Sequence, residues 1–129
     1  MCRLLLADDD IQQLAIRKLL LEAAGHQVTT AEAAPEARRM LADLRPEVLV
    51  MDLRLPKLKD GLSLIRCVDE QRLAVKIIVL SGWIEELWDL PEEKLVSSIL
   101  GKPFRNEQLL EAISAAVSAP SRNLPQAAS

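Results

Sequence analysis

Short apolar runs that stop at polar or turn-forming residues recur along this chain of 129 residues. Runs of this kind are typical of strands that are buried on both faces of a parallel sheet. Segments with helical spacing lie between the runs, and this alternation predicts an α/β domain with a parallel sheet. The strands are expected at about residues 3–7, 27–31, 48–52, 76–80 and 97–100.

Helix-forming segments separate these strands. The first helix is expected over about residues 11–24, because Asp10 is placed to cap its start and Gly25 to end it. Pro35 suits the first turn of the second helix. Two further helices are expected at about residues 61–71, after a loop at 53–60, and at 106–117 with Asn106 as N-cap.

The segment between the fourth and fifth strands has an irregular pattern. Ile84, Leu87 and Trp88 have helical spacing, but Pro91 interrupts it. Proline inside a helix costs about 3 kcal/mol or more, so Pro91 is better suited to start a new helix. We therefore expect a short, broken or displaced helix here, with at least one of Trp83 and Trp88 packed on the core. The segment is rich in acids, namely Glu85, Glu86, Asp89, Glu92 and Glu93.

Four of the predicted strands end at polar residues that suit one another chemically. The first strand leads into Asp8-Asp9-Asp10 and the third ends at Asp52. The fourth leads into Ser81-Gly82 and the fifth into Lys102-Pro103. Because sites in open α/β sheets lie at the carboxyl ends of the strands, we expect these groups to meet at one edge of the sheet.

Carboxylates, an ammonium and a hydroxyl at one point predict a site for a metal and a phosphate. Several carboxylates suit Mg²⁺, which takes oxygen ligands and keeps some of its waters. Lys102 supplies a point charge for a phosphate oxygen, and Ser81 supplies a hydroxyl donor. Each group also has a structural interpretation: a solvated helix start for the acids, a salt bridge for Lys102 and a turn for Ser81. The coincidence of all four at successive strand ends favours the site.

Composition and charge exclude several other classes of function. The net charge of -3 and the scattered basic residues argue against direct binding of nucleic acid. The apolar runs are far shorter than the roughly 20 residues of a membrane span, so no membrane partner is expected. Because the chain goes directly into a strand, we expect no signal peptide.

Cysteine and histidine are too scarce for several kinds of chemistry. Two cysteines, Cys2 and Cys67, are too few for a disulfide framework and are expected to be buried free thiols in a reducing cytoplasm. The single histidine, His26, follows Gly25 and is expected at a helix end or in a loop. A zinc site or a Ser-His-Asp triad is therefore not expected.

Five motifs carry a resemblance to a known family. The chain resembles the receiver domain of bacterial two-component response regulators over about residues 3–117. The resemblance implies one doubly wound domain at residues 1–118. Residues 119–129 contain two prolines, two serines and little that could pack, which predicts a flexible tail or the start of a linker there. The resemblance also implies a five-stranded parallel sheet in the order 2-1-3-4-5, flanked by about five helices. The motifs are Leu6-Ala7-Asp8-Asp9-Asp10, Val50-Met51-Asp52-Leu53-Arg54-Leu55-Pro56, Asp60-Gly61, Ser81-Gly82 and Lys102-Pro103-Phe104.

The resemblance implies a role for each acidic residue of the site. Asp52 would be the phosphoacceptor, which takes a phosphoryl group from a histidine of a histidine kinase or a histidine phosphotransfer protein. Asp9 would bind Mg²⁺ directly, and Asp8 would bind it largely through water. Asp52 and the backbone carbonyl of Arg54 would complete the protein's share of the metal ligands.

The remaining roles concern the phosphoryl group and the output. Lys102 would pair with the phosphoryl oxygens, Ser81 would hydrogen-bond them, and the Gly82 N–H would assist. The Lys102–Pro103 peptide would be cis. Phosphorylation would shift the face made by the fourth helix, the fifth strand and the fifth helix, and so control an effector. This face could also form a homodimer, and the only enzymatic activity expected is self-phosphorylation from small donors and slow autodephosphorylation.

Two features depart from the family's pattern, besides the broken fourth helix. Ile99, three residues before Lys102, stands where an aromatic switch residue is usual. The loop at 53–60 is about one residue longer than is common, which would shift Arg54 or widen the mouth of the site. Arg54 and Trp83, each two residues beyond a strand-end group, either shield the phosphoryl group from water or point to solvent.

Two alternatives to a phosphorylated receiver follow from the same residues. An aspartyl-phosphate phosphatase usually carries a second Asp two residues after the nucleophile, and this chain has Arg54 there. A receiver-like interaction module that works without phosphorylation would be favoured by the loss of an acid, Asp52 or Lys102. None of these residues is missing, but the altered fourth helix keeps this alternative open.

Overall fold

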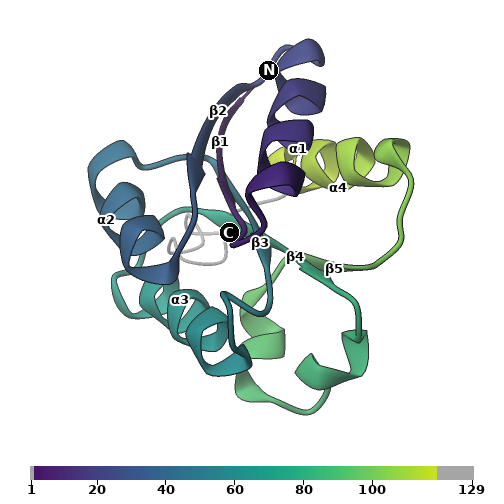
Figure 1. Ribbon diagram of the computed structural model, residues 1–129. Helices are drawn as coiled ribbons and strands as arrows, with labels where there is room; N and C mark the ends of the chain where they lie inside the picture. Colours follow the sequence, from purple (N-terminus) through teal and green to yellow (C-terminus); the bar gives the residue numbers. More distant parts are fainter. Residues whose placement is uncertain (1, 119–129) are drawn as a thin grey trace.

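The chain folds as an alternation of strands and helices around one sheet (Figure 1). The computed structural model describes residues 2–118, and the tail predicted at 119–129 lies outside the described residues. The strands are β1 (Arg3–Ala7), β2 (Gln27–Ala31), β3 (Val48–Asp52), β4 (Lys76–Ser81) and β5 (Ser98–Gly101). The α-helices are α1 (Ile11–Ala23), α2 (Ala34–Leu44), α3 (Leu58–Glu70) and α4 (Asn106–Ser118).

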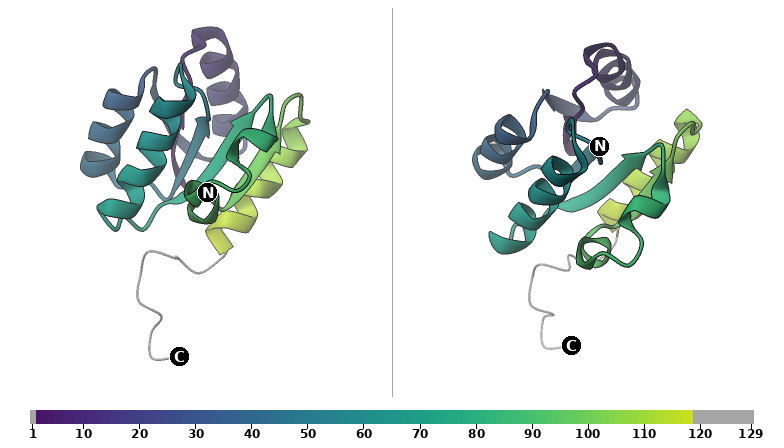
Figure 2. Two further views of the ribbon diagram at one scale, coloured as in Figure 1. Left: turned by 90° about the horizontal axis from the view of Figure 1, so that it is seen from below. Right: turned by 60° about the horizontal axis from the view of Figure 1, so that its bottom comes forward.

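The five strands are parallel and lie in the order β2-β1-β3-β4-β5. Helices α1 and α4 cover one face of the sheet, and α2 and α3 cover the other (Figures 1 and 2). This confirms the predicted doubly wound architecture and strand order. Because all strands run the same way, their carboxyl ends meet at one edge, where β1 and β3 are direct neighbours.

Two hydrophobic cores lie on opposite faces of the sheet, and the strands supply both by alternation. In β3, Leu49 and Met51 belong to the core under α2 and α3, while Val48 and Val50 belong to the core under α1 and α4. All four side chains are 0% exposed. Burial on both faces explains why these strands are continuous apolar runs in the sequence.

Helix α3 begins at Leu58, three residues earlier than the start predicted at Gly61. The carboxylate of Asp60 accepts a hydrogen bond from the Lys57 backbone N–H at 3.2 Å, which satisfies a donor just before the helix. Gly61 therefore lies inside the first turn. A Cβ atom there would lie 1.7 Å from the carbonyl oxygen of Leu53, so this position packs the helix against the chain just after Asp52.

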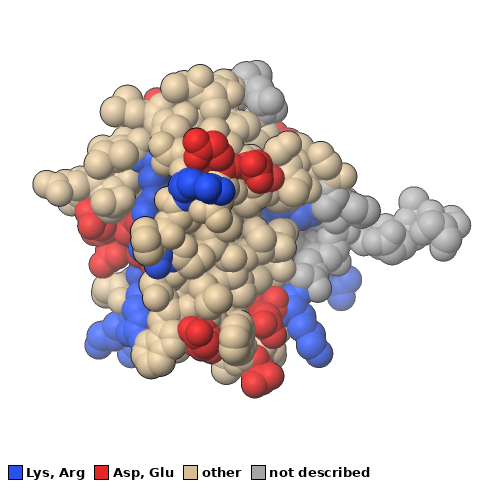
Figure 3. Space-filling model, turned by 90° about the vertical axis from the view of Figure 1, so that its right-hand side faces the viewer, with Lys and Arg blue, Asp and Glu red and all other residues tan. Residues whose placement is uncertain are grey.

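The segment between β4 and β5 forms two 3₁₀-helices, η1 (Ile84–Leu87) and η2 (Pro91–Leu95), in place of an α-helix. The predicted broken helix is confirmed, but the count of about five helices is corrected to four α-helices within residues 2–118. Pro91 starts η2 as expected. Uncharged residues fill most of the face of the molecule on this side, and acidic side chains gather at its lower margin (Figure 3).

Both tryptophans of this segment lie at the surface. Trp83 is 63% exposed and Trp88 is 53% exposed, so the prediction that one packs on the core was wrong. Leu87 fills the core position instead and is 0% exposed. A 3₁₀-helix has about three residues per turn, so residues that are spaced for one face of an α-helix do not share a face in it.

The helix ends follow local hydrogen bonding. Asp10 caps α1, because its Oδ1 accepts hydrogen bonds from the N–H groups of Gln12 and Gln13. Asn106 is the first residue of α4 and not its cap, which corrects the prediction. The residue before it, Arg105, donates its N–H to Gln108 Oε1 at 2.7 Å. Among the residues that the structure describes, no helix has the length and hydropathy needed to cross a membrane.

The cysteines and the histidine lie where the sequence placed them. Cys2 and Cys67 are free and buried. His26 lies in the turn after α1, where its Nδ1 accepts a hydrogen bond from the Cys2 backbone N–H at 3.1 Å. This contact lies at the end of the sheet opposite the carboxyl ends of the strands.

Candidate functional site

Three carboxylates meet at the carboxyl ends of β1 and β3. Asp8 and Asp9 follow the last residue of β1, and Asp52 is the last residue of β3. One carboxylate oxygen of each lies within 4.8 Å of the others. Asp8 is buried, Asp52 is partly buried and Asp9 is exposed, so the cluster opens to solvent on one side. The sequence predicted this meeting from the strand ends alone.

Lys102 brings a positive charge to Asp52 from the loop after β5. Its Nζ lies 2.9 Å from Asp52 Oδ2, and their side chains are 31% and 16% exposed. The Lys102 backbone N–H also donates to the Ser81 carbonyl at 2.8 Å, which ties the loop to the end of β4. The Lys102–Pro103 peptide is cis, as predicted. A second cis peptide, Leu55–Pro56, was not predicted.

The protonation of Asp52 is set by opposing effects. Burial raises the pKa of the Asp52 carboxyl, and the nearby Asp8 raises it further. The ammonium of Lys102 opposes both, and so does a backbone hydrogen bond from Arg54, yet the pKa of Asp52 stays above its ordinary value. A carboxylate of raised pKa is a better electron-pair donor, which is useful in a group that attacks phosphorus.

Ser81 is the last residue of β4, which pairs with β3, and Gly82 follows it. Ser81 is 2% exposed, and its Oγ accepts a hydrogen bond from the Trp83 backbone N–H at 3.0 Å. In this arrangement the hydroxyl stabilises the turn, which is the structural interpretation that the sequence left open. The hydroxyl hydrogen is still available to donate. Gly82 is exposed.

The side chain of Arg54 is paired with an acid of the segment after β4. It forms a two-pronged ion pair with Glu86 of η1, with Arg54 Nε 3.3 Å from Glu86 Oε2. The pair joins the loop after β3 to the segment after β4, the two loops that border Asp52. From the sequence we expected the Arg54 side chain either to shield the phosphoryl group or to point to solvent. An ion pair with Glu86 was not foreseen. Glu86 raises the pKa of Arg54, which keeps the guanidinium charged.

Arg17 is a site residue that sequence reasoning missed. Its Nη1 lies 2.6 Å from Asp8 Oδ2, and the two side chains are 10% and 1% exposed. Arg17 lies three residues after Leu14 and four before Leu21, the buried apolar residues of α1. A charged residue in the middle of an apolar helix face was the signal that could have revealed it.

The donor set fits a magnesium ion. Three carboxylates that reach one point, with an open side for water, are the ligands that Mg²⁺ prefers. With no soft ligand in the cluster, the set does not favour zinc or copper. The carbonyl of Arg54, two residues beyond Asp52, is placed by the sequence on the same loop.

Comparison with known proteins identifies the family. The sequence model of the response regulator receiver domain matches residues 4–114. The virulence transcriptional regulatory protein PhoP of Salmonella typhimurium is 34% identical over 113 residues, which cover 85% of this chain and 49% of PhoP. PhoP of Escherichia coli K12 is also 34% identical, over 111 residues, covering 84% and 48%. The chain therefore belongs to the response regulator receiver domain family, and it spans about half the length of these relatives.

Solved structures agree with this assignment. A receiver domain from Clostridium thermocellum superposes with a TM-score of 0.82 at 27% identity, covering 91% of this chain and 94% of the other. The chemotaxis response regulator CheY4 of Vibrio cholerae gives a TM-score of 0.79 at 26% identity, covering 90% and 98%. The fold is thus that of a receiver domain in two-component signalling.

Proposed function

We propose that this chain is a phosphorylatable receiver that accepts a phosphoryl group on Asp52. The observation that carries the proposal is the contact of Lys102 Nζ with Asp52 Oδ2 at 2.9 Å inside a cluster of three carboxylates. The donor is the phosphohistidine of a histidine kinase or a histidine phosphotransfer protein. A cytoplasmic location is supported by the two free cysteines, Cys2 and Cys67, which suit a reducing compartment.

The transfer needs little more than positioning and charge. A carboxylate oxygen of Asp52 forms a bond to phosphorus while the phosphorus–nitrogen bond to the histidine breaks, and the ring leaves with the electron pair. Lys102 then moves from Asp52 to the phosphoryl oxygens and offsets their charge. Asp8, Asp9, Asp52 and the Arg54 carbonyl would hold Mg²⁺, which supplies further charge neutralisation when bound. The chain's own catalysis is limited to self-phosphorylation from small donors and slow autodephosphorylation.

The output follows from the change of charge at Asp52. The Ser81 hydroxyl turns from the Trp83 N–H toward the phosphoryl group, with the Gly82 N–H beside it. This movement of Ser81 shifts the face formed by η1, η2, β5 and α4. That face would contact an effector or a second copy of the chain. Because Ile99 replaces an aromatic residue, the shift uses the loop itself and not the rotation of a ring.

A binding assay with beryllofluoride, a mimic of the phosphoryl group, tests this proposal. Wild type and Asp52→Ala are mixed with Mg²⁺, beryllium and fluoride, and bound fluoride is observed by ¹⁹F NMR. We expect signals of bound fluoride with the wild type only, and only when Mg²⁺ is present. Absence of bound fluoride with the wild type would favour a receiver-like interaction module that works without phosphorylation.

A further inference from the structure

Arg17 is a buried cation that belongs to neither the predicted metal ligands nor the phosphoryl-binding groups. It lies on the face of α1 that packs on the sheet, where the other buried side chains are Leu14 and Leu21. Taking a guanidinium out of water is costly unless it is well paired. Its partner is the carboxylate of Asp8, which lies 2.6 Å away and is 1% exposed.

Both carboxylate oxygens of Asp8 already accept a hydrogen bond from the protein. Its Oδ1 accepts the Asp10 backbone N–H at 2.9 Å, and its Oδ2 accepts Arg17 Nη1. A water held by the metal would have to donate to one of these same two oxygens. Because Oδ2 can accept a second hydrogen bond, the guanidinium does not exclude that water, but its positive charge at 2.6 Å weakens the attraction of Asp8 for a cation and for the waters around it.

The formal charges of the cluster show how Arg17 opposes the binding of a metal ion. Three carboxylates, those of Asp8, Asp9 and Asp52, stand against the cations of Lys102 and Arg17, which leaves a formal charge of minus one. Without Arg17 the charge would be minus two. A divalent cation binds more weakly to the less negative cluster, and burial strengthens this effect because screening by solvent is reduced.

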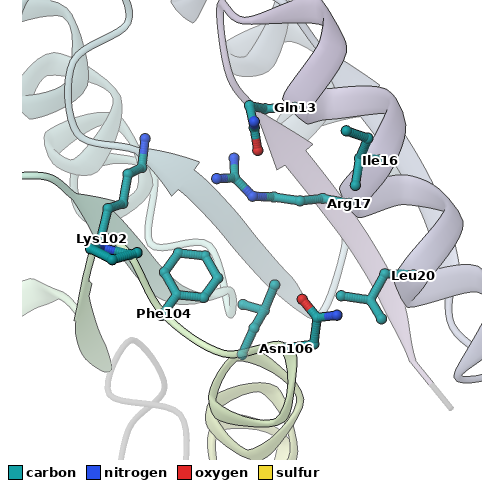
Figure 4. Close-up of a pocket in the computed structure, with 9 residues that line it drawn as sticks. Gln13, Ile16, Arg17, Leu20, Lys102, Phe104 and Asn106 are labelled. Carbon is teal, nitrogen blue, oxygen red and sulfur yellow. The ribbon is translucent and has the colours of Figure 1, made fainter.

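A cavity beside Arg17 offers the guanidinium a second position. It has a volume of about 410 Å³ and lies between α1 and α4, bordered by Arg17, Lys102 and Phe104. The guanidinium carbon lies 5.5 Å from the centre of the Phe104 ring, within the range of a cation–π contact. Figure 4 shows Arg17 extending from α1 with Gln13 on one side and Phe104 on the other. A guanidinium that left Asp8 would therefore find space in this cavity beside the ring.

We propose that Arg17 is an internal cation that competes with Mg²⁺ for Asp8 and so lowers the metal affinity of this receiver. Binding of Mg²⁺ displaces the guanidinium from Asp8 into the cavity between α1 and α4. By linkage, whatever holds Arg17 in that cavity strengthens metal binding by the same factor. The inference rests on the magnesium site proposed above, and it concerns the strength of that site.

Titration calorimetry with magnesium chloride tests the competition. The proteins are the wild type, Arg17→Met, which removes the charge and keeps a long side chain, and Lys18→Met. Lys18 is the matched control, because it is the next residue of α1 and pairs only loosely with Glu22 at 3.9 Å. We expect Arg17→Met to bind Mg²⁺ on the order of tenfold more tightly than the wild type. Lys18→Met should bind like the wild type.

Thermal unfolding separates this role from a purely structural one. Without Mg²⁺, Arg17→Met leaves Asp8 as a buried, uncompensated charge, so its Tm should fall. Added Mg²⁺ should raise the Tm of Arg17→Met more than that of the wild type. A structural role alone would lower the Tm equally with and without the metal. Arg17→Gln, which is neutral but can still donate to Asp8, serves if Arg17→Met does not fold.

The outcomes distinguish this inference from the proposed function. Equal Mg²⁺ affinities for the wild type and the Arg17 variants would overturn the competition and leave the magnesium site in place. Failure of every protein to bind Mg²⁺ would overturn both. If Lys18→Met also bound Mg²⁺ more tightly, the effect would come from the net charge of α1. That result would overturn a specific competition for Asp8.

Discussion

At the scale of single residues, Arg54 and Trp83 lie on two different loops, each two residues beyond a strand-end residue, Asp52 (the proposed phosphoacceptor) and Ser81. Arg54 is held by Glu86, and Trp83 directly follows the Ser81-Gly82 turn with 63% of its surface exposed. We expect water that hydrolyses an aspartyl phosphate to approach between these two loops. The Arg54–Glu86 pair and the indole therefore stand where they can slow its approach.

Removal of both side chains tests this shielding. We expect the double variant Arg54→Ala, Trp83→Ala to lose its phosphoryl group severalfold faster than the wild type, because water reaches phosphorus more freely. The rate is followed by the release of inorganic phosphate from the phosphorylated protein. Trp88→Ala, which removes an equally exposed indole farther along the chain, is the control. Equal rates for the double variant and the wild type would refute the shielding.

His26 gives a prediction on pH that does not depend on the acidic cluster. Burial lowers the pKa of His26 below its ordinary value of 6.5, against the opposing effect of Glu47. As the pH falls through 6.5, the unfolded chain therefore takes up its proton before the folded protein does. The contribution of His26 to stability is thus present above this pH and is lost below it.

Substitution of His26 by asparagine removes this titration and keeps a hydrogen-bond acceptor. Denaturant unfolding of the wild type and His26→Asn is compared at about pH 7.5 and about pH 5.5, on either side of the free histidine pKa. We expect the loss of unfolding free energy on acidification to be smaller for His26→Asn. An equal loss in both proteins would show that His26 does not sense pH in this way.

At the scale of elements, the segment that carries η1 and η2 is held to the domain by charges as well as by apolar contacts. Glu92 of η2 is 6% exposed, and its Oε2 accepts a hydrogen bond from Arg66 Nη1 of α3 at 2.7 Å. Glu86 of η1 pairs with Arg54. Short 3₁₀-helices have weak internal bonding, so such anchors decide how firmly the segment is docked.

Loss of the buried anchor should loosen the segment selectively. We expect Glu92→Ala to lower the local stability of residues 84–96 by about 1–2 kcal/mol, since a hydrogen bond between charged groups is lost. Hydrogen–deuterium exchange of the backbone amides measures this, with faster exchange in the segment and little change in β1 and β3. Glu93→Ala is the matched control, because Glu93 is the neighbouring acid on the same turn. Exchange that is equally fast in both variants would contradict the anchor.

The elements also show where sequence reasoning succeeded and where it stopped. The ends of β1 and β3 were predictable, because strands buried on both faces leave a sharp boundary between apolar residues and the first acid. The start of α3 was not predictable. Gly61 is a poor helix former, but it lies inside the helix because it packs closely against Leu53, and the helix begins before it. The partner of Arg54 depends on the path of η1, which local spacing does not encode.

At the scale of the whole molecule, parallel strand order turns four separate motifs into one site. Residues 8, 52, 81 and 102 lie far apart along the chain, yet all four end strands or follow them at the same edge of the sheet. The sequence predicted the cluster because the carboxyl ends of parallel strands lie at one edge of a sheet. Arg17 was missed because it comes from the side of a helix, and only the packing of α1 on the sheet shows that it reaches Asp8.

The most direct test of the central claim is the intact mass of the protein after incubation with Mg²⁺ and a small phosphodonor such as acetyl phosphate. We expect the wild type to gain the mass of one phosphoryl group, and to gain nothing when Mg²⁺ is chelated. Asp52→Ala should gain nothing under any condition. The same adduct on Asp52→Ala, or none on the wild type, would contradict the assignment of Asp52 as the phosphoacceptor.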